Sequence, residues 1–262
     1  MINPERCNIL DSKKLMKYIL LTLSICVSLS SMGQAYDAYL RLTFIKAKEG
    51  SNYSENLTQK FARLHQQRIE DGIINGWDLW RVVNSRQTPF SHVVVTLTDI
   101  SKMDSLYSGV DMQKVFPDMT NSDIKTFYEN NITSRDIIGD YIITTVKSIS
   151  KANTIPEEFM VMNFMKVKEG KFKTFEDMEI DLTTAAMHDE KFRTGWTLQK
   201  RIDKYGTDLY WNYLTVDWYS KYSDYIKASS IPTIDADKDY QSMMAIRDLR
   251  DRTVLRKIMS VR

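Results

Sequence analysis

The chain has 262 residues, of which 36 are basic and 34 are acidic, so its formal net charge is +2. A near-neutral chain has no overall field to attract nucleic acid or an anionic membrane, and we expect neither as a partner. Two cysteines, three histidines and no phosphate-binding glycine motif leave little for a thiol nucleophile, a transition metal or a nucleotide. We therefore expect no cofactor and no bound metal.

Residues 1–35 have the three-part pattern of a secretory signal peptide with an upstream extension. A basic start at Met16 leads into a short apolar run, and the small residues Gly33 and Ala35 precede the predicted cleavage site. The apolar run is shorter than a bilayer-spanning helix requires. We expect cleavage near Ala35, export to the periplasm or the extracellular space, and no stable membrane anchor. Whether synthesis starts at Met1 or at Met16 stays open.

Cleavage after Ala35 would also set the chemistry of the mature chain. Both cysteines, Cys7 and Cys26, lie in the removed segment, so the mature chain has no disulfide and no thiolate. The segment carries four basic and two acidic residues of the totals of 36 and 34, which leaves a net charge of about zero. Lipid attachment at Cys26 is an alternative, although Ile25 occupies a position that favours a small residue.

The rest of the chain repeats itself. The sequence Gly-Trp-Asp-Leu at 76–79 returns as Gly-Trp-Thr-Leu at 195–198, and Lys-Ala-Lys-Glu-Gly at 46–50 returns as Lys-Val-Lys-Glu-Gly at 166–170. The copies are 119 to 120 residues apart, and such a fixed spacing indicates two copies of one structural unit. We expect one repeat over residues 36–150 and the other over residues 151–262.

Each repeat predicts the same order of elements. An alternating first strand leads through a glycine turn into an amphipathic helix, and the helix ends before the repeated tryptophan that starts a second strand. A third strand, a mostly polar helical stretch and a last strand follow. The first strands are expected at 39–45 and 159–165, the third strands at 91–98 and 210–217, the helical stretches at 121–130 and 241–249, and the last strands near 141–146 and 253–259. This β-α-β-β-α-β order is the ferredoxin-like unit and makes the fold class α+β.

With this tandem order, the chain resembles the dimeric α/β-barrel superfamily in a fused, two-copy form. The resemblance covers nearly all of the mature chain and rests on the element order and the internal repeat. It implies that two sheets face each other and close an intramolecular barrel with helices outside; separate repeats that dimerise with another chain are the alternative. Members include cofactor-independent monooxygenases, haem-handling proteins and isomerases, so the resemblance implies a fold far better than a function.

The strand faces indicate where a ligand would bind. Side chains alternate across a strand, so Leu40, Leu42 and Phe44 share a wholly apolar face, while the opposite face is mixed. We expect the helices to cover the apolar faces and the mixed faces to line the space between the two sheets. The mixed faces would bring to that space Arg41, Thr43, His92, Asn163, Trp211 and Tyr213.

These side chains suit a small, partly apolar ligand. Arg41 could pair with a carboxylate or a phenolate, and Asn163 and Tyr213 could donate hydrogen bonds. Such polar groups in a largely apolar and aromatic wall are typical of ligand pockets. His92 is the one histidine on a predicted strand, which makes it the candidate general base near neutral pH. The alternative is a barrel filled by its own side chains.

Three functions remain open at this point. The first is an exported binding protein for a small, partly apolar ligand. The second is a cofactor-independent monooxygenase or isomerase, which requires a general base such as His92. The third is a structural or interaction protein with a filled barrel. The first two need a cavity and the third forbids one, while the ligand and the oligomeric state are left undetermined by the sequence.

Overall fold

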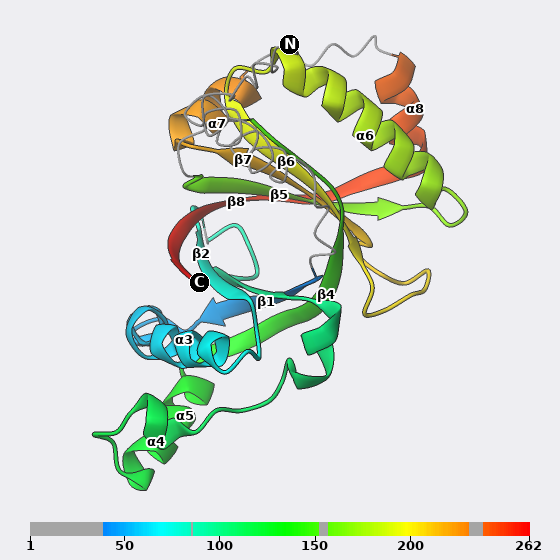
Figure 1. Cartoon of the computed structure of the whole chain (residues 1–262). Helices are drawn as coiled ribbons and strands as arrows, with labels where there is room; N and C mark the ends of the chain where they lie inside the picture. Colours follow the sequence, from blue (N-terminus) through cyan, green and yellow to red (C-terminus); the bar gives the residue numbers. More distant parts are fainter. Residues whose placement is uncertain (1–38, 85, 152–156, 231–237) are drawn as a thin grey trace, which may run out of the picture. The chain divides into compact units, whose positions relative to one another are not determined.

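The computed structural model describes residues 39–84, 86–151, 157–230 and 238–262, with the side chains of Asp239 and Tyr240 left aside (Figure 1). The signal-peptide prediction for residues 1–35 lies outside the described residues. All the helices and strands described below belong to one compact unit, Asp37–Arg262.

The fold is α+β, as the sequence predicts, and its eight strands form one antiparallel sheet. In the first half of the unit the elements are β1 (Tyr39–Ala47), α2 (Tyr53–Asn56), η1 (Leu57–Phe61), α3 (Ala62–Glu70), β2 (Gly76–Val82), β3 (His92–Thr98), η2 (Ile100–Ser105), α4 (Met112–Val115), α5 (Asn121–Thr133) and β4 (Arg135–Ser150). In the second half they are β5 (Phe159–Val167), α6 (Phe172–Asp189), β6 (Arg193–Arg201), β7 (Tyr213–Tyr219), α7 (Tyr222–Ser229), α8 (Lys238–Ile246) and β8 (Arg247–Val261).

The third strand of the second half begins later than predicted. It starts at Tyr213, so the placement of Trp211 on a strand is wrong. The pairing explains the error, because Ile45 lies opposite His92 while the matching Met165 lies opposite Tyr213. The hairpin before β7 is two residues longer than the hairpin before β3. A constant spacing of 119 residues therefore aligns His92 with Trp211, whereas its structural counterpart is Tyr213.

The strands pair in the order β1-β3-β2-β8-β5-β7-β6-β4, and β4 pairs in turn with β1, which closes the order into a barrel. Two long strands connect the halves. β4 pairs with β1 through its first part and with β6 through its second, and β8 pairs in the same way with β5 and β2. Because each long strand serves two neighbours, both extend well beyond the short segments that the sequence predicts for them.

The wholly apolar strand faces point into the barrel. Phe44 of β1 and Phe164 of β5 belong to strands that are not neighbours, yet their ring centroids lie 5.8 Å apart. Trp80 of β2 and Trp218 of β7 likewise meet at 5.7 Å. One buried cluster joins apolar residues of seven of the eight strands, so the middle of the barrel is packed with side chains.

The mixed strand faces lie under the helices, so the predicted assignment of the two faces is wrong. Ile45 and Val94 pack against Tyr53 and Leu57 of the first helical segment. In the second half, Met165 and Tyr213 pack with residues of α6 and α8, which also contact each other (Figure 1). The physical reason is that a closed interior excludes water and must be apolar throughout, while a helix-covered face can satisfy polar groups at its edges.

Candidate functional site

A pocket opens at one end of the barrel, where β1 and β5 finish and β3 and β7 begin. We call it the mouth pocket; its volume is about 190 Å³ and its walls are mostly aromatic. It is lined by Phe44, Pro89, Phe90, Ile138, Tyr141, Phe164, Tyr210, Trp211 and Asp251. Both halves of the chain contribute, and Asp251 is the only charged residue among those that line it.

Four aromatic rings form a closed circuit at this end of the barrel. Phe44 lies 5.5 Å from Tyr141, Tyr141 lies 5.0 Å from Trp211, and Trp211 lies 5.5 Å from Phe164, which returns to Phe44 at 5.8 Å. These separations, with edge-to-face or tilted rings, are favourable for aromatic pairs. The guanidinium of Arg201 lies 4.3 Å from the centre of the Tyr141 ring and 5.3 Å from that of Trp211. Each of the four rings therefore contacts two others, and the rings of Tyr141 and Trp211 also contact Arg201.

The pocket walls come from matching positions in the two halves. Phe44 and Phe164 occupy the same register position in β1 and β5, and Phe90 and Trp211 each lie two residues before the third strand. The residues paired with these two phenylalanines on β4 and β8 differ between the halves. Gly139 lies opposite Phe44, while Asp251 lies opposite Phe164.

Of the six predicted site residues, Trp211 alone lines the mouth pocket. Tyr213 donates a 2.6 Å hydrogen bond to Glu176 on α6 and packs against Phe175, so it lies under the helix and not in the barrel. Burial of the Tyr213 hydroxyl and its bond to Glu176 raise its pKa. The ligand contact predicted for Tyr213 required a position inside the barrel, and Tyr213 does not lie there.

His92 also lies under the helices. Its Nε2 is 3.1 Å from the hydroxyl of Ser54, its Nδ1 is 2.9 Å from the hydroxyl of Ser91, and its ring meets Tyr53 edge-on. Burial, aided by the charge of Arg81, lowers the pKa of His92 to about 4. Both ring nitrogens are engaged and the imidazole is neutral at physiological pH, which makes His92 a poor general base.

Arg41 and Thr43 form a local ion-pair site on the same outer face. The Arg41 guanidinium donates to Asp140 at 2.6 and 2.9 Å, and the Thr43 hydroxyl donates to the same carboxylate at 3.0 Å. The guanidinium also lies 4.5 Å from the centre of the Tyr107 ring. These contacts satisfy both side chains within the chain and separate them from the mouth pocket.

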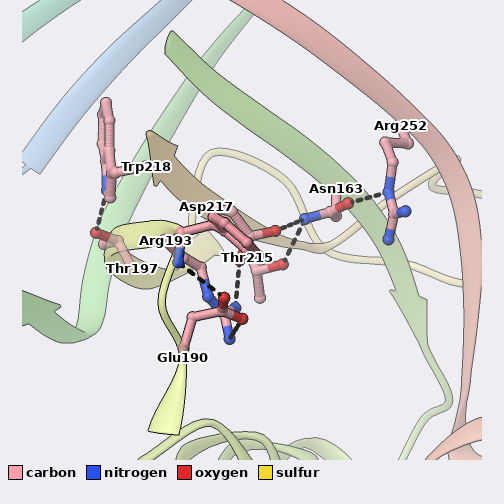
Figure 2. A network of polar contacts seen from close by, with 9 residues as sticks. Asn163, Glu190, Arg193, Thr197, Thr215, Asp217, Trp218 and Arg252 are labelled. Atoms are coloured by element: carbon pink, nitrogen blue, oxygen red, sulfur yellow. Dashed lines mark hydrogen bonds and ion pairs between the residues drawn. The ribbon is translucent and has the colours of Figure 1, made fainter. Parts of the chain in front are cut away.

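Asn163, the last of the six, is at the centre of a polar network on the outer face of the second half (Figure 2). Its amide nitrogen donates to Thr215 at 3.2 Å and to Asp217 at 2.9 Å, and its oxygen accepts from Arg252 at 2.7 Å. Asp217 in turn accepts a 2.5 Å bond from Arg193. The side chains of Arg193 and Asp217 are only 16% and 15% exposed, so this ion pair is largely shielded from water.

Glu179 of α6 adds an unusual carboxyl group to this region. Burial raises its pKa to about 7, with a further rise from Asp217 that is opposed by Arg247 and Arg193. A raised pKa of this kind is typical of groups that transfer protons, but Glu179 does not line the mouth pocket. Sequence reasoning missed Glu179 because its partners come from β6, β7 and β8 and no local motif marks it.

Neither a metal site nor a membrane-spanning helix occurs in the described part of the chain. Within ranges 39–84, 86–151, 157–230 and 238–262, no group of three or more His, Cys, Asp or Glu residues is placed to hold a metal ion. In those same ranges, no helix combines the length and the apolarity needed to cross a membrane.

Similarity to known proteins is confined to the level of structure. No protein-family model matches the sequence, and no curated protein matches it either. Among solved structures, an anthrone oxidase-like protein aligns with a TM-score of 0.55 at 8% identity, over 87% of this chain and 93% of its own. A provisionally named monooxygenase from Fusobacterium nucleatum aligns with a TM-score of 0.55 at 12% identity, over 87% and 95% of the two chains.

A third structure, a provisionally named monooxygenase from Lactobacillus acidophilus, aligns with a TM-score of 0.52 at 12% identity, over 86% of this chain and 96% of its own. These structural neighbours share the ferredoxin-like fold of dimeric α/β barrels. At such low identity the likeness establishes the fold alone, and it does not select a subfamily.

Proposed function

We propose that this protein binds a small, partly apolar ligand in the mouth pocket. The observation that carries the proposal is a concave site of about 190 Å³ with aromatic walls drawn from both halves of the chain and a single charged group. Pockets of this composition are typical of small-molecule sites, in which apolar walls provide affinity and a few polar groups fix the orientation. The packed middle of the barrel confines the ligand to the mouth.

We further propose that the two halves are copies of one ferredoxin-like unit, residues 36–150 and 151–262, joined as the intramolecular counterpart of a dimeric α/β barrel. The strand registers support this. The pairing of β1 with β4 shifts between Phe44 and Ile45, and the pairing of β5 with β8 shifts between the matching Phe164 and Met165. Bulges at matching positions are a feature that independent folds would not share by chance.

Binding can be tested with the intrinsic fluorescence of Trp211. A library of small aromatic and aliphatic compounds would be titrated against the purified chain and against Trp211→Phe, with Trp196→Phe as the matched control because Trp196 lies under α6, outside the pocket. We expect quenching that saturates in the parent chain and in the control variant but is lost in Trp211→Phe. Equal quenching in all three chains would place the ligand elsewhere and refute the proposal.

A cofactor-independent monooxygenase is the second candidate, because two structural neighbours are provisionally named monooxygenases and another is an anthrone oxidase-like protein. The reaction would take place in the mouth pocket, whose volume of about 190 Å³ makes a one-ring phenol a suitable first substrate. We expect oxygen uptake in the presence of the phenol, and a purified chain that binds the phenol without taking up oxygen would exclude this function.

We also propose that the chain is exported after cleavage near Ala35. The basic start, the apolar run and the small residues at Gly33 and Ala35 support this. Intact-mass measurement of the protein from the producing cell's exported fraction should give a chain that begins at Tyr36. An exported chain that retains the residues before Tyr36 would contradict the proposal.

A further inference from the structure

Asp251 places a negative charge in the mouth pocket, and the aromatic walls around it favour a cationic ligand as the carboxylate does. The carboxylate lines the pocket together with rings of Phe44, Tyr141, Phe164 and Trp211. Aromatic faces attract cations through their quadrupoles, and a desolvated cation gains about 2 kcal/mol from such a contact. A carboxylate beside several rings is therefore an arrangement that favours an organic cation over a neutral or an anionic ligand.

The charge of Asp251 is not neutralised by the cationic side chains around it. Its carboxylate accepts a 2.7 Å hydrogen bond from the backbone N–H of Arg252, and none of the ion pairs among the described residues includes it. The neighbouring Arg250 pairs with Asp248 at 3.1 Å. Arg252 directs its side chain to Asn163 on the outer face of the sheet. Arg201 is held by Asp203 through bonds of 2.8 and 2.9 Å.

Asp251 has no charged counterpart in the first half of the chain, so its carboxylate is a specific feature of one side of the pocket. At the register position of Asp251 the first half has Gly139, and a β-carbon at Gly139 would lie 2.6 Å from Cζ of Tyr141. The missing side chain lets the Tyr141 ring fold over this end of β4. One side of the pocket thus presents a carboxylate and the other side presents the ring of a tyrosine.

We propose that the mouth pocket selects a small organic cation, a primary or quaternary amine on an apolar body, which pairs with Asp251 and stacks on the surrounding rings. This inference rests on the proposed binding function and specifies its ligand class. A volume of about 190 Å³ accommodates a single ring or a short branched chain but not a polycyclic molecule.

Three ligands that share one ring and differ in charge test this: benzylammonium, benzyl alcohol and benzoate. Titrations monitored by Trp211 fluorescence and by calorimetry should show benzylammonium binding about tenfold more tightly than benzyl alcohol, with benzoate weakest. In Asp251→Asn the advantage of the cation should vanish while benzyl alcohol still binds. Asp136→Asn is the matched control, because that exposed carboxylate on β4 lies near Lys48 and outside the pocket lining.

The outcomes separate the two claims. Equal or tighter binding of benzyl alcohol by the parent chain would overturn the cation preference and leave the pocket itself standing. A cation preference that survives in Asp251→Asn would overturn the role of the carboxylate. No saturable response to any of the three ligands would count against both the cation class and the proposed binding function. Far-ultraviolet circular dichroism would verify that each variant keeps the fold.

Discussion

Replacing Glu179 by glutamine should make the protein more stable at pH 8 and leave its stability unchanged at pH 4.5. The pKa of Glu179 is raised from 4.5 to about 7 in the folded chain, so the folded state favours the protonated carboxyl. Below pH 4.5 the group is protonated in both the folded and the unfolded chain and carries no penalty. Between pH 4.5 and 7 the unfolded chain ionises while the folded chain keeps its proton, so the penalty grows over this range and is complete above pH 7. Glutamine resembles the protonated acid and avoids that cost.

The size of the effect follows from the shift. One pKa unit corresponds to about 1.4 kcal/mol, so the upper limit is about 3 kcal/mol at high pH. Because Glu179 is only half-buried, solvent screening reduces the expected gain to roughly 1–2 kcal/mol. Urea denaturation at a series of pH values from 4.5 to 8 would measure it, with Asp181→Asn, an exposed carboxylate of the same helix, as the control. A difference between Glu179→Gln and the parent chain that does not grow with pH would refute the reasoning.

Three other changes have defined outcomes. Asp217→Asn leaves the largely buried Arg193 without its carboxylate and should lower the free energy of unfolding by about 3 kcal/mol, measured by urea denaturation; an unchanged midpoint would contradict this. Gly139→Ala places a β-carbon against the Tyr141 ring and should cost about 1–3 kcal/mol in thermal unfolding; an unchanged midpoint would contradict this. The pKa of His92, lowered from 6.5 to about 4, should cost the chain stability as the pH falls below 6.5, by up to about 1.4 kcal/mol per pH unit. In His92→Asn that part of the acid sensitivity should disappear, and an identical pH dependence in the two chains would rule out the histidine as its source.

The alternating strands could be predicted because their period is local and strong. The residues of β1 and β5 show it directly, and both strands occur where the sequence places them. The start of β7 could not be placed in this way, because the preceding hairpin is longer by two residues and the repeat spacing changes across it. The pair Phe90 and Trp211, aromatic residues just before each third strand, is the sequence signal that marks the shift.

Which face of a strand points inward depends on how the barrel closes, and the alternation of residues within one strand does not reveal this. Both faces of β1 carry apolar residues, so periodicity alone cannot say which face meets the helices. The sequence nevertheless contained a usable signal. From Leu40 to Phe44 that face has no polar residue, and a compartment without water tolerates none that lacks a partner. The polar network around Asn163 and Asp217 depends on contacts between distant strands and has no counterpart in a linear motif.

The shared long strands have a consequence for how the protein is made. The second part of β4 pairs only with β6, and the last part of β8 pairs only with β2. When the first half has left the ribosome, it therefore still presents unpaired strand edges of the kind that recruit other chains. Productive folding must wait for the C-terminal residues of β8, so the whole barrel should form in one late, cooperative step. A chain released before β8 is complete would be a substrate for chaperones or proteases.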